Sequence, residues 1–103
     1  MSTSLSALEP WLQPYASWLV NLYPAAEVTS VRRTWSEQSY LYRRFLAGQT
    51  DYPAAPPGRS LHEQGRAFDL KAPPEVLEQL GEIWEQMGGR WGGRFQDPIH
   101  FEA

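Results

Sequence analysis

The chain has 103 residues, 42% of them hydrophobic and 14% aromatic, which is enough apolar material for one packed core and excludes an intrinsically disordered chain. Its formal net charge of −3 argues against a nucleic-acid partner, and the absence of cysteine excludes disulfide scaffolds, thiol catalysis and thiolate metal sites. We therefore expect one domain over residues 1–103, in which any bound metal is held by nitrogen and oxygen ligands.

The first quarter of the chain carries the apolar spacing of one helix face. Its apolar residues recur at alternating steps of three and four: Leu5, Leu8, Leu12, Tyr15, Leu19 and Leu22. Pro14 lacks the backbone N–H that would bond to residue 10, so we expect the helix to be kinked or to begin near Pro14. The same segment has no basic run ahead of its apolar residues, and polar residues and prolines interrupt it. It predicts neither a signal peptide nor a membrane span.

The next part of the chain predicts a strand, a helix and a long loop. The β-branched run at residues 27–33 is typical of a strand. Thr34 and Glu37 have the spacing of a capping box, which starts a helix that ends at Gly48. Residues 49–61 contain three prolines and no periodicity, and a loop of this length in a small domain is often functional.

The last third of the chain predicts one more helix among short strands. Residues 66–70 have the pattern of a strand, and residues 73–87 that of a helix started by proline and ended by two glycines. The apolar stripe of this helix consists of Val76, Leu80, Ile83, Trp84 and Met87. Residues 90–103 predict two short strands with a turn at Asp97. The fold class that follows is α+β.

Four aromatic residues are candidates for either packing or a cleft. Trp35 and Trp84 lie on apolar faces of the predicted helices, so we place both in the core. Tyr52 in the proline-rich loop and Trp91 beside two glycines could line a cleft. Packing is the commoner role of such residues, and we predict it for both.

The residues with catalytic chemistry are few and concentrated. The chain has only two histidines and three aspartates, and four of these five residues fall within residues 60–70 and 95–103. A catalytic zinc uses three protein ligands and one open position for water, and two histidines with one carboxylate are a common set. His62, Asp69 and His100 can supply that set if the two strands that carry Asp69 and His100 are neighbours.

The residues around these ligands support the same hypothesis. Gly65 permits a turn with positive φ after His62, and the following strand places Gly65, Ala67 and Asp69 on one face. Asp97, three residues before His100, is placed to act as a general base on a metal-bound water. Glu102 is a second candidate for that role, although a partner that holds a ligand histidine or an arginine is the commoner part for such a residue.

These motifs resemble a known family. The pattern is Ser60-x-His62-x-x-Gly65-x-Ala67-x-Asp69, followed by Asp97-x-x-His100-Phe101-Glu102. It is similar to the zinc D-Ala-D-Ala carboxypeptidases and dipeptidases, a family that includes phage endolysins that cut L-Ala-D-Glu bonds. The resemblance implies a small antiparallel sheet flanked by about three helices, the fold shared with hedgehog signalling domains. It also implies Zn²⁺ on His62, Asp69 and His100, and Asp97 as the catalytic base.

The resemblance extends to residues that would contact the substrate. An upstream arginine of the family steadies the substrate carbonyl or carboxylate, and in the run Ser30-Val31-Arg32-Arg33 that role falls on Arg33. The Gly-Tyr pair that precedes this arginine in the family is absent here, which leaves Arg32 as an alternative. Ser60 matches a serine that would contact substrate.

The predicted function is therefore zinc-dependent hydrolysis of an amide bond in peptidoglycan stem peptide, by a monomer with no nucleic-acid partner. The sequence leaves open whether the bond is D-Ala-D-Ala or L-Ala-D-Glu. The alternative from another class is a non-catalytic module that binds cell-wall peptide or forms part of a phage structure. The predicted absence of a signal peptide favours a phage product that is released to the wall or carried on a virion, or an enzyme that trims recycled wall peptides in the cytoplasm.

Overall fold

A four-stranded antiparallel sheet in the order β1-β2-β4-β3 lies at the centre of the computed structural model, which describes residues 2–103. Its strands are β1 (Glu27–Ser30), β2 (Ala67–Lys71), β3 (Arg90–Trp91) and β4 (His100–Glu102). The helices are α1 (Gln13–Val20), α2 (Trp35–Leu46) and α3 (Pro74–Gln86). Three short 3₁₀ turns complete the fold: η1 (Leu5–Ala7), η2 (Leu61–Gln64) and η3 (Gly92–Phe95). The predicted α+β class and small antiparallel sheet are confirmed.

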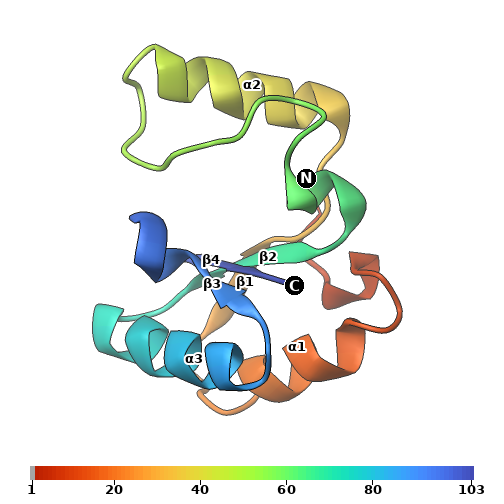
Figure 1. Ribbon diagram of the computed structural model, residues 1–103, viewed down its shortest axis with the longest axis vertical. Helices are drawn as coiled ribbons and strands as arrows, with labels where there is room; N and C mark the ends of the chain where they lie inside the picture. Colours follow the sequence, from red (N-terminus) through yellow and green to blue (C-terminus); the bar gives the residue numbers. More distant parts are fainter. Residues whose placement is uncertain (1) are drawn as a thin grey trace.

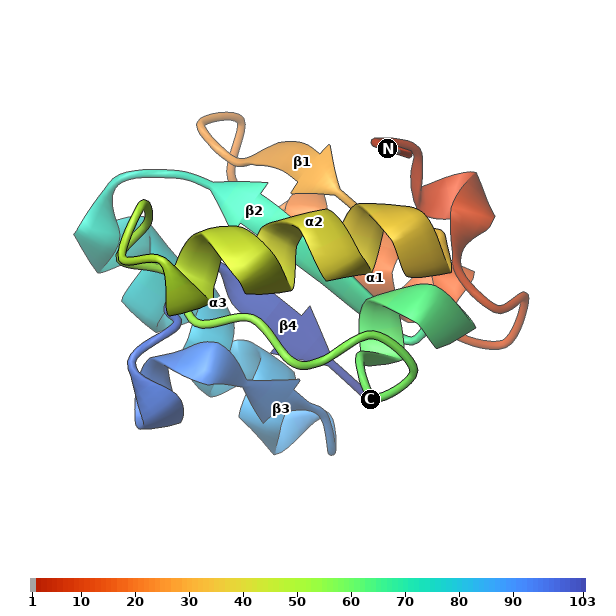
Figure 2. The same cartoon turned by 90° about the horizontal axis from the view of Figure 1, so that it is seen from above.

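The helices are divided between the two faces of the sheet. Figure 1 shows α1 and α3 together on one side, and α2 with the loop that follows it on the other. Seen from above, α2 passes across the strands (Figure 2). Of the helices that the structure describes, none is long and apolar enough to cross a membrane.

The hydrophobic core lies between the sheet and the pair α1 and α3. Phe68 of β2 and Phe101 of β4 are stacked, and Trp84 of α3 meets the Phe68 ring edge-on. Within residues 2–103 the core cluster contains no side chain of α2: it consists of Leu8, Leu12, Ala16, Leu19, Val31, Phe68, Leu70, Leu77, Leu80, Trp84, Trp91 and Phe101. Trp84 and Trp91 pack as predicted, and the Trp91 indole N–H donates to the Pro98 carbonyl at 2.8 Å.

The N-terminal helix differs from its prediction in the face that it buries. Helix α1 begins at Gln13, as Pro14 indicates, and the residues before it form η1 and a turn. Because the chain is not α-helical before Gln13, the predicted apolar face of residues 5–22 does not continue into α1. Ala16 is buried in place of Tyr15, which is 56% exposed, and Leu22 is also exposed.

Two other predictions on elements need correction. The strand predicted over residues 27–33 ends at Ser30, because the backbone of the next residues bonds elsewhere: Val31 N–H donates to Ser2 and Arg33 N–H donates to His62. In α3, Leu80 and Trp84 are buried as predicted, but Met87 is exposed at the C-terminal end of the helix and Leu77 is buried in its place.

Helix α2 has the predicted boundaries, but it does not pack against the core as predicted. Its capping box is present: Thr34 N–H donates to the Glu37 carboxylate and Glu37 N–H donates to the Thr34 hydroxyl. Trp35, however, is 62% exposed, because α2 stands off the core and Gln38 is its buried residue. The prediction that Trp35 belongs to the core is therefore wrong.

Candidate metal centre

His62 is held by a short, well-capped turn below α2. The Ser60 hydroxyl accepts from the His62 backbone N–H at 3.2 Å, and Gly65 ends η2 with a left-handed φ of 69°. The His62 ring is 2% exposed, and its Nδ1 lies 2.6 Å from the Val31 carbonyl oxygen. Since a carbonyl oxygen only accepts, Nδ1 donates to Val31, and Nε2 is the ring nitrogen that faces Asp69.

Asp69 and His100 meet across neighbouring strands. The register of β2 and β4 pairs Asp69 directly with His100. His100 Nε2 lies 2.7 Å from the Glu102 carboxylate on the same face of β4, so it donates there and turns Nδ1 toward Asp69. The predicted contact between Glu102 and a ligand histidine is present.

The three side chains form a compact triangle. His62 Nε2 lies 3.2 Å from Asp69 Oδ1 and 3.3 Å from His100 Nδ1, and His100 Nδ1 lies 3.5 Å from Asp69 Oδ1. In tetrahedral zinc sites the N and O ligands lie 2.0–2.1 Å from the metal, and two such ligands are therefore about 3.3 Å apart. The spacing of the triangle fits that geometry. Within residues 2–103, it is the one group of three or more potential ligands close enough to hold a metal.

The charges of this cluster are strongly coupled. Burial disfavours the charged form of His100, but hydrogen bonds to Asp69 and Glu102 outweigh it and raise the His100 pKa to about 9. Burial acts to raise the Asp69 pKa, but the hydrogen bonds from His100 and His62 hold that pKa below its usual range. The hydrogen bond from His100 likewise lowers the pKa of Glu102. In the metal-free protein the Asp69 and Glu102 carboxylates are therefore ionised and paired with His100, and Asp69 is also paired with Arg33.

Arg33 lies against the outer oxygen of the Asp69 carboxylate. Its Nη2 donates to Asp69 Oδ2 at 2.8 Å, its Nε to Ser30 Oγ at 3.1 Å, and its Nη1 to Gln38 Oε1 at 3.2 Å. Burial lowers the Arg33 pKa despite the favourable Asp69 charge. Arg32, the alternative, lies outside the cleft and forms a loose ion pair with Glu9 at 3.8 Å.

Asp97 lies between η3 and β4, and one of its carboxylate oxygens has no hydrogen-bond partner among the described residues. Its backbone is held by hydrogen bonds from Asp97 N–H to Gly92 and from His100 N–H to Asp97. Among the described residues, its Oδ1 is the one buried side-chain nitrogen or oxygen atom with no hydrogen-bond partner. Burial raises the Asp97 pKa. A buried carboxylate oxygen without a donor is costly unless a ligand or water supplies one.

The glycine at position 92 makes this arrangement possible. A Cβ atom there would lie 2.1 Å from the Asp97 carbonyl oxygen and 2.9 Å from His100 Cβ. Position 92 therefore admits no side chain while Asp97 and His100 keep their places. The two glycines after Trp91 are visible in the sequence, but this contact depends on the fold.

The metal group and Asp97 open into one cleft of about 720 Å³. On the sheet side it is lined by His62, Asp69, Arg90, Phe95, Asp97, Ile99, His100 and Glu102. On the opposite side it is lined by residues of α2 and of the segment 50–61: Gln38, Leu41, Arg44, Thr50, Tyr52, Pro53, Ala54, Ala55, Arg59, Ser60 and Leu61. Arg33, between β1 and α2, lines the cleft next to Asp69. Tyr52 is 52% exposed and lines the cleft, so the prediction that it packs is wrong. Ser60 lines the cleft and also caps the turn that carries His62.

Among the cleft residues that were given no role from the sequence, three are polar and lie on α2 or in the loop that follows it: Gln38, Arg44 and Arg59. Gln38 is almost fully buried and joins Arg33 to the loop, because its Nε2 donates to the Ala55 carbonyl at 2.9 Å. Arg44 on α2 and Arg59 at the end of the loop also line the cleft. No sequence motif includes these two arginines. Only the folded chain shows that they line the cleft.

Comparisons with known proteins support the fold. No protein-family model and no curated protein matches this chain. Among solved structures it is similar to the vancomycin-resistance D,D-pentapeptidase VanY from a VanB-type resistance cassette, crystallised as a mutant in complex with Zn(II). That likeness has a TM-score of 0.72 and 20% sequence identity over 93% of this chain and 72% of the other.

A second solved structure has the same fold. The L-Ala D-Glu endopeptidase ChiX of Serratia marcescens aligns with a TM-score of 0.70 and 20% identity over 96% of this chain and 82% of the other. These two proteins represent the two activities to which the sequence resemblance pointed. The fold implied by that resemblance is confirmed.

Proposed function

We propose that this chain is a zinc-dependent hydrolase of an amide bond in peptidoglycan stem peptides. One observation carries the proposal: a triangle of ligand atoms with zinc spacing shares a cleft with a buried carboxylate oxygen that has no partner among the described residues. The two structural neighbours, a D,D-pentapeptidase with Zn(II) and an L-Ala D-Glu endopeptidase, support the choice of substrate.

His62 Nε2, Asp69 Oδ1 and His100 Nδ1 would hold the zinc ion. Zinc at this position would lower the pKa of a water molecule to about 7 and polarise the scissile carbonyl. The protein keeps the three ligand atoms in place through their outer neighbours: Val31 for His62, Glu102 for His100 and Arg33 for Asp69.

Asp97 is the general base of the proposed reaction. Its unpartnered Oδ1 would accept the proton of the attacking water and pass it to the leaving amine nitrogen. This oxygen is buried in the cleft wall, and no donor among the described residues occupies it. Glu102 is the weaker candidate, because its carboxylate is already engaged by His100.

Arg33 has two tasks in this site. Three of the five N–H groups of its guanidinium donate to Ser30, Gln38 and Asp69, which leaves two donors. The remaining donors can reach a substrate oxygen on the cleft side, where they would stabilise developing negative charge. Ser60 would contact the substrate from the same side of the cleft.

The test is digestion of purified peptidoglycan by zinc-loaded protein, with the fragments identified by mass spectrometry. We expect new peptide termini with the wild type and none with Asp97→Ala. Asp51→Ala is the matched control, because Asp51 is the chain's remaining aspartate, is exposed and does not line the cleft.

The fragment masses also decide the finer question. Loss of one D-Ala would identify a D-Ala-D-Ala carboxypeptidase, and release of a peptide beginning with D-Glu would identify an L-Ala-D-Glu endopeptidase. If zinc-loaded wild type produced no new termini while still binding the peptides, the non-catalytic binding module would be the correct function instead.

A further inference from the structure

The two sides of the cleft differ in how their charges are partnered. We call the sheet side, named above by its lining residues, the floor, and the side formed by α2 and residues 50–61 the roof. The floor carries three carboxylates, Asp69, Asp97 and Glu102. The roof has no acidic side chain in its lining, and Arg44 and Arg59 lie on it.

Two of the four arginines that line the cleft have carboxylate partners. Arg33 pairs with Asp69 at 2.8 Å. Arg90 lies 3.8 Å from the Glu102 carboxylate and stacks over the Phe95 ring at 4.7 Å. These contacts tie both guanidinium groups to residues of the metal site.

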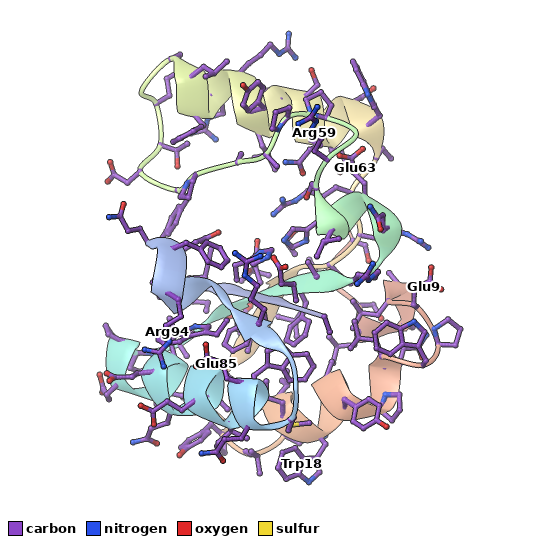
Figure 3. The ribbon with its side chains drawn as sticks, in the orientation of Figure 1. Glu9, Trp18, Arg59, Glu63, Glu85 and Arg94 are labelled. Atoms are coloured by element: carbon purple, nitrogen blue, oxygen red, sulfur yellow. The ribbon has the colours of Figure 1, made fainter. Side chains whose placement is uncertain are left out.

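Arg44 and Arg59 have no such partner within residues 2–103. The Arg44 guanidinium reaches only the Gln49 carbonyl, at 3.5 Å, and the Tyr40 ring, 5.8 Å away. The Arg59 side chain makes no hydrogen bond or ion pair with any described residue. Glu63 is four residues away, but both of its oxygens accept from Gly58 N–H, at 2.9 and 3.1 Å. Figure 3 shows Arg59 and Glu63 on the α2 side of the molecule, whereas Arg94 pairs with Glu85 on the α3 side.

We propose that Arg44 and Arg59 form an anion subsite on the roof, which binds a carboxylate of the substrate away from the bond that is cut. Guanidinium groups bind carboxylates through paired, charge-assisted hydrogen bonds. Both roof arginines keep these donors free of other carboxylates, in a chain whose acidic residues outnumber its basic residues by 12 to 9. Two arginines without a carboxylate partner, on a roof that contributes no acidic side chain to the cleft lining, favour an anionic ligand.

The inference rests on the proposed function for the identity of that ligand. A stem peptide whose third residue is lysine offers two carboxylates of the required chemistry: the C-terminal carboxylate and the free carboxylate of its D-Glu residue. Each can be removed separately by amidation without changing the peptide bonds. The two sources can therefore be distinguished experimentally.

The experiment measures binding separately from hydrolysis. Four synthetic stem peptides, unmodified, amidated at either carboxylate, or amidated at both, are titrated calorimetrically into zinc-loaded and metal-free Asp97→Ala protein. We expect one of the two amidations to weaken binding about tenfold, the usual scale of one charge-assisted hydrogen-bonded contact. The peptide that loses affinity identifies the carboxylate.

Variants of the roof arginines then test whether the loss of affinity on amidation depends on Arg44 and Arg59. In the Arg44→Gln/Arg59→Gln double variant, also carrying Asp97→Ala, the unmodified peptide should bind as weakly as the amidated one, and amidation should have no further effect. Arg43→Gln is the matched control, because Arg43 lies next to Arg44 on α2, is exposed and does not line the cleft. That variant should bind the unmodified peptide more tightly than the amidated one, by the same factor as the protein with both roof arginines intact.

The subsite is overturned if no stem peptide binds, if both amidations leave the affinity unchanged, or if the double variant still discriminates. Hydrolysis by wild type is scored independently. Cleavage without carboxylate-dependent binding removes the subsite and leaves the proposed function. Carboxylate-dependent binding through Arg44 and Arg59 without cleavage removes the proposed hydrolysis and leaves the subsite.

Discussion

Strand β2 sends Phe68 and Leu70 to the side of the sheet that α1 and α3 cover, and Asp69 to the side that faces the cleft. The first side contributes apolar rings and aliphatic chains to the core. The second holds a carboxylate against two histidines and an arginine. Burying apolar surface stabilises the fold, whereas burying charges costs free energy unless they are well paired.

The comparison shows that stability and chemistry are assigned to opposite faces of the same strands. In β4 the arrangement repeats: Phe101 is fully buried in the core, and His100 and Glu102 point to the cleft. A substitution on one face should therefore alter one property and largely leave the other unchanged. The following predictions test that separation.

The largest effect should come from the cleft face. Asp97→Asn removes the proposed base and should lower kcat about 10²–10⁴-fold, the range for loss of a general acid or base. Its free energy of unfolding should stay the same or rise, because burial of the Asp97 carboxylate already disfavours its charge. Steady-state hydrolysis of a stem peptide and urea denaturation measure the two quantities. A variant with wild-type kcat would remove Asp97 from the mechanism.

The core face should show the opposite behaviour. Phe68→Ala deletes a fully buried ring that contacts Trp84 and Phe101, and should cost about 3–5 kcal/mol of unfolding free energy. Urea denaturation measures this loss. Zinc stoichiometry, determined by elemental analysis of the folded fraction, should remain that of the wild type. If Phe68→Ala lost zinc while it stayed folded, the two faces would not be separable.

Zinc should raise stability only when the cleft face is intact. At a free zinc concentration 100 times the Kd, binding to the folded state should add about 2.7 kcal/mol. His100→Ala removes one ligand and should abolish most of this gain, as judged by the midpoint of thermal unfolding with and without zinc. Glu78→Gln on exposed α3 is the control and should respond as the wild type does. An equal response of His100→Ala would contradict the assignment of the ligands.

The last prediction concerns the metal-free protein and its dependence on pH. The pKa of His100 is raised to about 9 by Asp69 and Glu102, above its value of about 6.5 in an unfolded chain. A raised folded-state pKa contributes stability that is fully present below pH 6.5 and is lost as the pH rises toward 9. With a chelator present, the unfolding free energy should fall across this window, and His100→Gln should flatten the fall. A pH-independent wild type would show that the coupled charges contribute no net stability.

Short-range patterns in the sequence were sufficient for much of the fold. The capping box at Thr34 and Glu37 starts α2 where expected, and the proline at position 14 marks the beginning of α1. The alternation around Asp69 correctly separated Phe68 and Leu70 from the polar face. These features depend on hydrogen bonds and side-chain directions within a few residues, which local sequence specifies.

The predictions that failed depend on what an element packs against. Trp35 lies on an apolar face of α2, yet that face meets no core because α2 covers a cleft. Tyr15 is exposed because α1 begins only at Gln13, after the predicted stripe has started, and Met87 is exposed because α3 ends at Gln86. Periodicity identifies an amphipathic helix without identifying its neighbour.

For the candidate site, the sequence by itself determined the chemical inventory: two histidines, Asp69 and Asp97 in two short segments with a turn-forming glycine between His62 and Asp69. Only the tertiary structure decided the pairing of Asp69 with His100, the attachment of Arg33 to Asp69, and the presence of Arg44 and Arg59 in the lining of the same cleft. The physical reason is chain separation. Contacts between residues dozens of positions apart are set by sheet register and helix placement, which no local pattern specifies.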